Sequence, residues 1–414
     1  MRGKPIITSL LDTDFYKFTM GLLVFLKYKN VPVEYAFKNR STVVALVEYI
    51  DEGELREQLD AVRTLRFNKS ELHYLRGTNE YGQRMFTEEY LEFLAGLQLP
   101  DYHLEIAGDE YRLEFAGSWA EAIYWETLAL SIVNELYFRN RIKSADLSSF
   151  EQETMYAKAR IKLADKIALI RKYPDITITD FGTRRRFSRD WQYYVVEALK
   201  TELGSQFLGT SNVKAAMDYA ILPMGTSAHE MYMVMSGIMH GSDDDIRASH
   251  SQTLHDWWEL YGYGLSVALT DTYGTDFFFR DFNSIQAQRW KGLRHDSGDP
   301  IVFGEKAIAF YQRHGINPME KLLIFSDGLD IQTIIKIADH FRSKIKVSFG
   351  WGTNLTNDLM FKPLSLVVKA TEANGHGTVK LSDNLAKAMG DPNDIERFKR
   401  IFGHTVTLNE ACVV

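Results

Sequence analysis

The sequence predicts an α/β protein in which a parallel barrel of strands and helices follows an α+β domain at the N-terminus. Between residues 176 and 349, short apolar runs alternate with amphipathic helical patterns, as in a chain of βα units. The preceding half mixes helical stretches with alternating strand patterns. At 414 residues, of which 45% are hydrophobic, the chain is long enough for two domains.

The N-terminal part begins with an expected helix over residues 12–30, capped by Asp12 or Thr13 and carrying an apolar stripe. Residues 31–37 alternate between apolar and polar positions, which predicts a strand. The following segments are predicted to be three polar helices, a hairpin at 102–106 and 111–115, and two long helices over 121–173.

Seven short apolar runs form the expected barrel strands. They are residues 176–180, 206–208, 220–224, 265–269, 289–293, 321–325 and 344–349. Nearly all end in glycine and a polar residue, and in a parallel barrel the loops at these ends converge on one pocket. Ordinary helix caps use the same residue types. Because the endings also include aspartates and arginines, we favour a shared site for anions and hydroxyl groups.

Two more strand-like stretches, at 364–370 and 378–381, precede an amphipathic C-terminal tail. We expect this part to return to the first domain. The predicted division is therefore 1–135 together with 364–414 for the α+β domain, and 136–363 for the barrel.

Composition restricts the ligands and the compartment. A net charge of −7 and a pI near 5.9 argue against nucleic-acid and membrane binding, so any anion site must be a local basic pocket. The only cysteine, Cys412, excludes an intramolecular disulfide and a cysteine metal cluster. Asp12, Asp14 and Lys17 interrupt the N-terminal apolar stretch, and no run reaches the roughly 18 apolar residues of a membrane helix. A cytoplasmic protein is expected.

His229 is the first candidate for chemistry, because it follows a glycine turn and opens a helical pattern. A helix start favours phosphate, and a neutral imidazole is an available nucleophile or base, so a histidine placed here can be phosphorylated. A helix cap or a core histidine is the alternative. The adjacent Glu230 can orient the imidazole or simply favour the helix dipole, and both readings stay open.

Three consecutive arginines, Arg184, Arg185 and Arg186, precede another helical pattern. Positive charge is unfavourable at a helix start, whereas an anion held there by arginines would explain it. A solvated surface is the alternative. Phe181 beside them can stack on a planar ring or belong to the core.

The turn 294–300 combines opposite charges. Asp296 or Asp299 can accept from ribose hydroxyls or from a magnesium-bound water, and Arg294 can bind an anion, unless the loop is merely self-paired. The glycine turns 326–328 and 350–353 follow the last two strands, where barrels commonly bind phosphate. Neither matches a Walker A motif.

Together these segments resemble the nicotinate phosphoribosyltransferase family. The matching blocks, in the family's order, are residues 11–20, 181–186, 209–213, 225–230, 294–300, 325–330 and 352–358. The resemblance implies an irregular α/β barrel and a homodimer with active sites shared between subunits. It also implies formation of nicotinate mononucleotide and pyrophosphate from nicotinate and phosphoribosyl pyrophosphate, the entry step of NAD salvage. ATP hydrolysis through a phosphohistidine, with Mg²⁺, would be coupled to this step, which places the enzyme in the ligase class.

The resemblance also implies roles for individual residues. His229 would be phosphorylated, and Phe181 and the partner's Tyr16 would enclose the pyridine ring. The remaining substrate contacts would be Arg294, Thr210 and Ser211 for the carboxylate, Arg184 for phosphate, Asp296 for ribose, and Gly328, Gly350, Gly352 and Thr353 for the 5′-phosphate, with Asp327 beside them.

Three other functions compete with this one. A nicotinamide phosphoribosyltransferase would be served by an aspartate near the amide, but residues 209–212 are uncharged and favour the acid. A metal-dependent barrel hydrolase would use Asp296, Asp299 and His229, yet no His-x-His pair lies at a strand end. A non-enzymatic sensor of NAD metabolites would keep the pocket without turnover.

Overall fold

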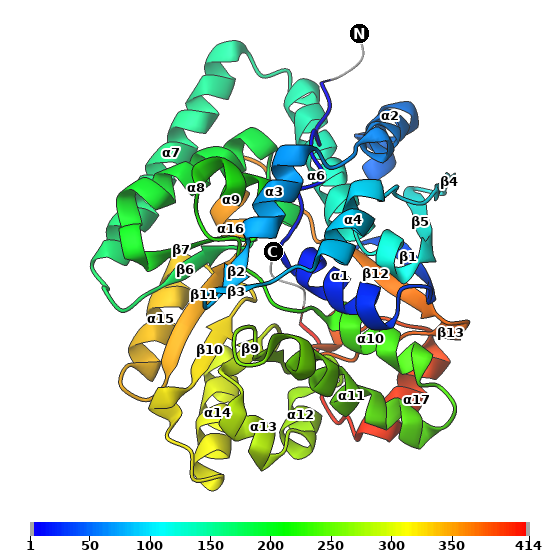
Figure 1. The fold of residues 1–414 in the computed structure, drawn as a ribbon. Coiled ribbons are helices and arrows are strands. Elements are labelled where there is room, and N and C mark those ends of the chain that lie inside the picture. Colours follow the sequence, from blue (N-terminus) through cyan, green and yellow to red (C-terminus); the bar gives the residue numbers. More distant parts are fainter. Residues whose placement is uncertain (1–3, 411–414) are drawn as a thin grey trace.

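The computed structural model describes residues 4–410 and contains two main sheets (Figure 1). The larger is a six-stranded parallel sheet in the order β7-β6-β11-β10-β9-β8. Its strands are β6 (Ile178–Asp180), β7 (Phe207–Thr210), β8 (Val267–Leu269), β9 (Gly292–His295), β10 (Leu322–Phe325) and β11 (Lys346–Trp351). The predicted α/β class with a parallel sheet is confirmed.

The barrel is irregular because one expected strand is missing. Residues 220–224 form no strand in the described chain, and Pro223 makes only an isolated bridge to Thr210. Proline has no N–H to donate to a ladder, which explains why pairing stops there. The strand prediction for 220–224 was wrong, and strands β7 and β8 at the two ends of the sheet do not pair with each other.

Helices follow the strands of this sheet. They are α8 (Arg189–Leu203), α9 (Val213–Tyr219), α10 (His229–Ile238), α11 (Asp243–Tyr261), α12 (Thr275–Asp281), α13 (Ser284–Arg289), α14 (Pro300–Arg313), α15 (Ile331–Phe341) and α16 (Thr353–Thr356). Several of their first turns are capped by strand-end residues: Asn212 caps α9, Asp299 caps α14 and Asp330 caps α15. Part of the polar pattern at the strand ends is therefore helix capping.

The second sheet is antiparallel, in the order β13-β12-β1-β5-β4. Its strands are β1 (Pro32–Asn39), β4 (Tyr102–Ala107), β5 (Glu110–Ser118), β12 (Leu366–Ala373) and β13 (His376–Gly377). Strand β12 pairs with β1 from Val33 opposite Ala373 to Asn39 opposite Leu366, so the C-terminal part of the chain completes a sheet that the N-terminal part begins. This pairing brings residues near 40 and residues 365–390 close to the barrel (Figure 1).

The remaining helices pack around both sheets. They are α1 (Tyr16–Lys27), α2 (Glu52–Thr64), α3 (Lys69–Gly77), α4 (Glu88–Gly96), α5 (Trp119–Ala122), α6 (Trp125–Ser144), α7 (Ser149–Arg171) and α17 (Pro392–Phe402). The predicted domain boundary between residues 135 and 136 lies inside the continuous helix α6. The division of the chain into two domains stays a prediction. No helix of the described chain is both long and apolar enough to span a bilayer. Cys412 lies outside the described residues.

The start of α1 differs from the prediction. The helix begins at Tyr16, with Phe15 in the cap position and no side-chain cap, so Asp12 and Thr13 do not cap it. Asp12 is buried, and its carboxylate accepts two hydrogen bonds from Arg186, at 2.6 and 2.8 Å. A bidentate buried ion pair stabilises this carboxylate more than an exposed helix end would.

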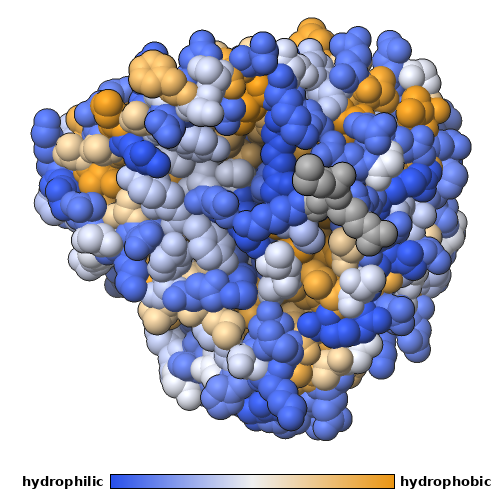
Figure 2. Space-filling view, turned by 90° about the horizontal axis from the view of Figure 1, so that it is seen from above, coloured by the Kyte–Doolittle hydropathy of each residue, from blue (hydrophilic) through white to orange (hydrophobic). Residues whose placement is uncertain are grey.

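The face shown in Figure 2 is mainly hydrophilic, with hydrophobic residues in small separate patches. Scattered apolar residues of this kind are normal on a folded surface.

Candidate active site

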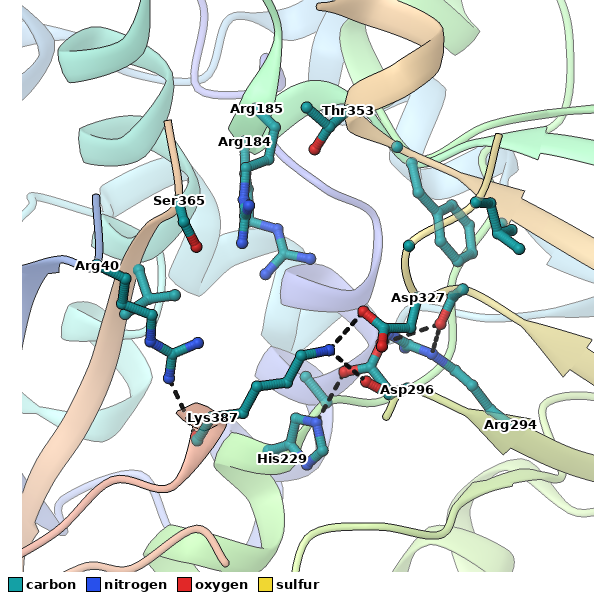
Figure 3. Close-up of a pocket in the computed structure, with 18 of the residues that line it drawn as sticks. Arg40, Arg184, Arg185, His229, Arg294, Asp296, Asp327, Thr353, Ser365 and Lys387 are labelled. Carbon is teal, nitrogen blue, oxygen red and sulfur yellow. Dashed lines mark hydrogen bonds and ion pairs between the residues drawn. The ribbon is translucent and has the colours of Figure 1, made fainter. Parts of the chain in front are cut away.

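One cavity lies at the carboxyl ends of the barrel strands, where the second sheet meets them (Figure 3). It collects most of the predicted site residues from segments far apart in the chain. These are Tyr16, Phe181, Arg184, His229, Arg294, Asp296, Asp327, Gly328, Gly350, Gly352 and Thr353. The convergence of strand-end loops predicted from the sequence is thus present for these residues.

The cavity wall is strongly cationic. Among its described lining residues, seven carry positive charge and two carry carboxylates. The cations are Arg40, Arg184, Arg185, Arg294, Lys369, Lys380 and Lys387, and the carboxylates are Asp296 and Asp327. Because the whole chain has a net charge of −7, this local excess of positive charge defines a site for an anionic ligand.

His229 opens α10 and is buried among charged groups. Its Nδ1 lies 2.9 Å from Thr272 Oγ1, and its Nε2 lies 2.9 Å from both Asp296 Oδ2 and Lys380 Nζ. Asp296 and Lys380 line the cavity, so Nε2 is the nitrogen on the cavity side. Nε2 has the lone pair of a nucleophile in the tautomer in which Nδ1–H donates to Thr272 and Nε2 accepts from Lys380, whereas the contact with the Asp296 carboxylate favours the tautomer with the proton on Nε2.

Burial and the neighbouring Lys380 lower the pKa of His229 to about 4, although Asp271 and Asp296 oppose this shift. The imidazole is therefore neutral near pH 7. Burial also lowers the pKa of Lys380, to about 8. Perturbed groups facing a cavity are typical of functional sites.

Two carboxylates beside His229 can hold a cation. Ligand atoms of His229, Asp271 and Asp296 lie within 4.8 Å of one another. Asp271 Oδ1 is buried without a hydrogen-bond partner among the described residues, which leaves an oxygen free for a ligand. Oxygen ligands suit Mg²⁺, so Asp271 and Asp296 fit the magnesium ion that the sequence predicted.

The turn after β9 is tied to the turn after β10. Arg294 donates from Nε to Ser326 Oγ at 2.9 Å and from Nη2 to Asp296 Oδ1 at 3.0 Å. Its guanidinium lies 5.8 Å from the centre of the Phe181 ring. Lys387 reaches across from the C-terminal part of the chain and pairs with Asp327 (Figure 3).

Tyr16 lines the cavity of its own chain. Its ring lies 5.4 Å from the Arg184 guanidinium, and its hydroxyl donates to Glu126 at 3.2 Å. Phe181 and Tyr16 of one chain line the same cavity. The contribution of the partner's Tyr16, which the resemblance implies, stays a prediction.

Behind the cavity, Lys17 joins two buried carboxylates. It lies 2.8 Å from Glu126 and 2.5 Å from Glu230. Burial alone would lower the pKa of Lys17, but the two carboxylates raise it above its usual value. Glu230 also accepts from Tyr35 and Trp119. Its role is thus to anchor the first turn of α10, which neither of the two sequence readings included.

The close approach of the Phe181 ring to the backbone of Gly350 explains why a glycine occupies this position. A Cβ atom at Gly350 would lie 2.3 Å from the Phe181 ring, so any larger residue would displace that ring from the cavity.

Four predicted residues have other roles. Thr210 and Ser211 do not line the cavity, because their buried hydroxyls donate to Asp180 and Asp14. Asp299 also lies outside it and caps α14. Arg186, which we had grouped with the anion-binding arginines, is fully buried against Asp12. In each case protein groups already use at least one of the polar atoms that a ligand would need.

Sequence reasoning missed five charged residues of this site: Arg40, Asp271, Lys369, Lys380 and Lys387. Two of them carried a signal. Lys369 and Lys380 interrupt apolar, strand-like runs, and a lysine in such a run is rarely buried without a partner. Of the other three, Asp271 lies just after the expected strand 265–269, Arg40 follows β1, and Lys387 ends a short 3-10 helix (Leu385–Lys387). Only the pairing of β12 with β1 brings Arg40 and Lys387 to the barrel.

A parallel barrel sheet whose glycine turns and cations surround one cavity defines an enzyme-like α/β protein with a site for phosphorylated small molecules. Comparison with known proteins gives the family. Residues 176–406 match the model described as the nicotinate phosphoribosyltransferase family, and residues 11–134 match its N-terminal domain.

Similar solved structures belong to the same family as the matching models. The nicotinate phosphoribosyltransferase from Vibrio cholerae is 33% identical over 97% of this chain and 94% of its own, with a TM-score of 0.85. That from Porphyromonas gingivalis is 31% identical over 96% of this chain and 100% of its own, with a TM-score of 0.84. The chain belongs to the nicotinate phosphoribosyltransferase family and is a phosphoribosyltransferase.

Proposed function

We propose that the protein transfers a phosphoribosyl group from phosphoribosyl pyrophosphate to nicotinate, forming nicotinate mononucleotide and pyrophosphate in the cytoplasm. The observation that carries this proposal is a cavity in which the rings of Phe181 and Tyr16 face seven cationic side chains. Aromatic rings suit the pyridine base, and the cations suit the carboxylate, the 5′-phosphate and the pyrophosphate.

The cavity fits the charge changes of this reaction. Departure of pyrophosphate from the anomeric carbon leaves positive charge on the sugar and adds negative charge to the leaving group. Arginine and lysine donors stabilise the leaving group, and Asp296 accepts from the ribose hydroxyls. A magnesium ion held by Asp271 and Asp296 would add further charge stabilisation when bound.

ATP coupling is the second part of the proposal. Neutral His229 attacks the γ-phosphorus of ATP through Nε2, so that an N–P bond forms, a P–O bond breaks and ADP leaves. Lys380, 2.9 Å from Nε2, neutralises the transferred phosphoryl group. The added negative charge alters the balance of the cationic wall, and water later hydrolyses the N–P bond.

The choice of nicotinate over nicotinamide now depends on Arg294. Thr210 and Ser211 are occupied by buried aspartates, whereas Arg294 lies beside the Phe181 ring and can pair with a carboxylate. A guanidinium favours the acid over the neutral amide.

The test is a product assay with labelled nicotinate or nicotinamide, phosphoribosyl pyrophosphate, Mg²⁺ and ATP. We expect nicotinate mononucleotide, faster with ATP, and at least roughly tenfold less product from nicotinamide. Arg294→Gln should reduce this preference. Equal rates with the two bases would refute the substrate assignment. A homodimer is a separate proposal, which light scattering tests.

A further inference from the structure

A second and larger groove lies beside the cavity. Its walls come from the turn after β1, from α6, from the segment before β12 and from residues 386 and 388, and its volume is about 810 Å³. This volume lies within the roughly 300–1,000 Å³ of small-molecule sites. Arg40 and Ser365 line both the groove and the cavity, so the two spaces adjoin. Figure 3 shows these two residues on the cavity side.

The groove is lined by cations without acids. Lys38, Arg40, Arg141 and Lys362 line it, and no aspartate or glutamate does so among the residues that the structure describes. In a chain with more acidic than basic residues, four cations without a carboxylate indicate an anionic ligand.

Arg141 is the groove cation that lies against two aromatic rings. Its guanidinium lies 4.9 Å from the ring centre of Tyr49 and 5.2 Å from that of Phe361. Its Nε is buried and has no hydrogen-bond partner in the described part of the chain. The two rings hold the guanidinium in place by cation–π contacts, but they accept no strong hydrogen bond. A buried donor without an acceptor is costly, and a bound anion would supply the acceptor.

The rest of the wall is apolar or aromatic. Tyr137, Val44, Pro363 and Leu364 contribute this surface. An inorganic anion would use only the cationic side, whereas a nucleotide would place its base and sugar against the apolar side and its phosphates against the cations.

We propose that this groove is a second binding site, separate from the cavity, for a nucleoside phosphate. The proposal goes beyond the reaction assigned to the cavity and does not depend on it. Arg40 Nη2 donates to the backbone oxygen of Lys387 at 3.1 Å, and Lys387 in turn pairs with Asp327 in the cavity. A phosphate that binds Arg40 in the groove therefore changes the position of Lys387 in the cavity. By linkage, a ligand in either site changes the affinity of the other site for its ligand.

The experiment is calorimetric titration of the full-length protein with ADP. We expect two ADP molecules per chain for the unchanged protein. Lys362→Gln, which alters an exposed residue, should weaken one site roughly tenfold, and Arg141→Gln should weaken the same site at least as much. Arg184→Gln should weaken only the other site. Thermal unfolding of each variant separates loss of binding from loss of folding, and Lys362→Gln alone decides if Arg141→Gln does not fold.

Two results would overturn the proposal. One is ADP binding that neither groove substitution changes. The other is inorganic pyrophosphate binding to the groove as tightly as ADP, because the apolar wall would then have no role. If the cavity binds no ADP, the proposed ATP coupling fails, but a single site sensitive to Lys362→Gln would still support the groove.

Discussion

Two buried charged clusters differ in what surrounds them. The closed cluster consists of Asp12, Arg186, Gln192 and Asn212, and none of its members lines the cavity. The open cluster consists of His229, Asp271, Asp296 and Lys380, and three of its members line the cavity. In the closed cluster the Asp12 carboxylate accepts hydrogen bonds from both Nη groups of Arg186 and from the side-chain amide of Asn212.

We assign the closed cluster to the stability of the fold and the open cluster to ligand binding. Both Nη groups of Arg186 donate to Asp12, and the two charges contribute to a fixed arrangement of the segment before α1 against the barrel. In the open cluster, one oxygen of Asp271 has no hydrogen-bond partner within residues 4–410, and the pKa of His229 lies far below its usual range. Groups that the protein leaves incompletely paired are available to a ligand, and such sites commonly reduce stability.

The largest effect on stability should come from Arg186→Met. It leaves the Asp12 carboxylate buried without its cation, which costs about 3–5 kcal/mol of unfolding free energy. Urea unfolding measures this loss. The matched control is Arg185→Met, since Arg185 lines the cavity and should affect substrate binding while changing stability by less than about 1 kcal/mol. Equal stability losses in both variants would remove the distinction between the clusters.

Lys17→Met should have an intermediate effect. Glu230 loses the cation 2.5 Å away but still accepts from Tyr35 and Trp119, and Glu126 keeps Lys369. We expect a loss of about 2–3 kcal/mol in urea unfolding. In this background Glu230→Gln should restore part of the stability, because the uncompensated charge disappears. A double variant no more stable than Lys17→Met would contradict the assigned contact.

The smallest expected effect is a gain in stability, caused by substitution of Asp383 near the open cluster. Burial and the nearby Asp271 raise the pKa of Asp383 from its usual 3.8 to about 6. A raised carboxyl pKa stabilises the fold at low pH, and this contribution is lost as the pH rises through about 6. Asp383→Asn should therefore be more stable than the unchanged protein by about 1–2 kcal/mol at pH 7.5.

This gain should disappear as the pH falls toward 4, because the carboxyl of the unchanged protein is then protonated. Thermal unfolding at several pH values measures it, with Asp109→Asn, an exposed aspartate in the turn between β4 and β5, as the control. A gain that is independent of pH would show that ionisation of Asp383 is not its cause.

The sequence predicts well what depends on local pattern. The parallel strands and the glycine turns at their ends follow from short apolar runs, and His229 follows from its place at a helix start. The sequence predicts poorly which polar side chains form hydrogen bonds within the protein instead of binding a ligand. Asp299 and Thr210 have the same residue types as residues that line the cavity, and only the three-dimensional arrangement shows that a helix start and Asp180 already use them.

Long-range pairing accounts for the other failures. Lys380 and Lys387 come from the part of the chain that follows β12, and no local feature places them beside His229 or Asp327. The run 220–224 has a strand-like composition, but Pro223 prevents regular pairing with β7.

The central claim is that His229 of the open cluster receives a phosphoryl group from ATP. The most direct measurement is incubation with γ-labelled ATP, followed by acid and base treatment of the labelled protein. We expect an acid-labile, base-stable label on the unchanged protein and none on His229→Asn, whose thermal stability should stay close to that of the unchanged protein. A label of equal intensity on His229→Asn would contradict the account.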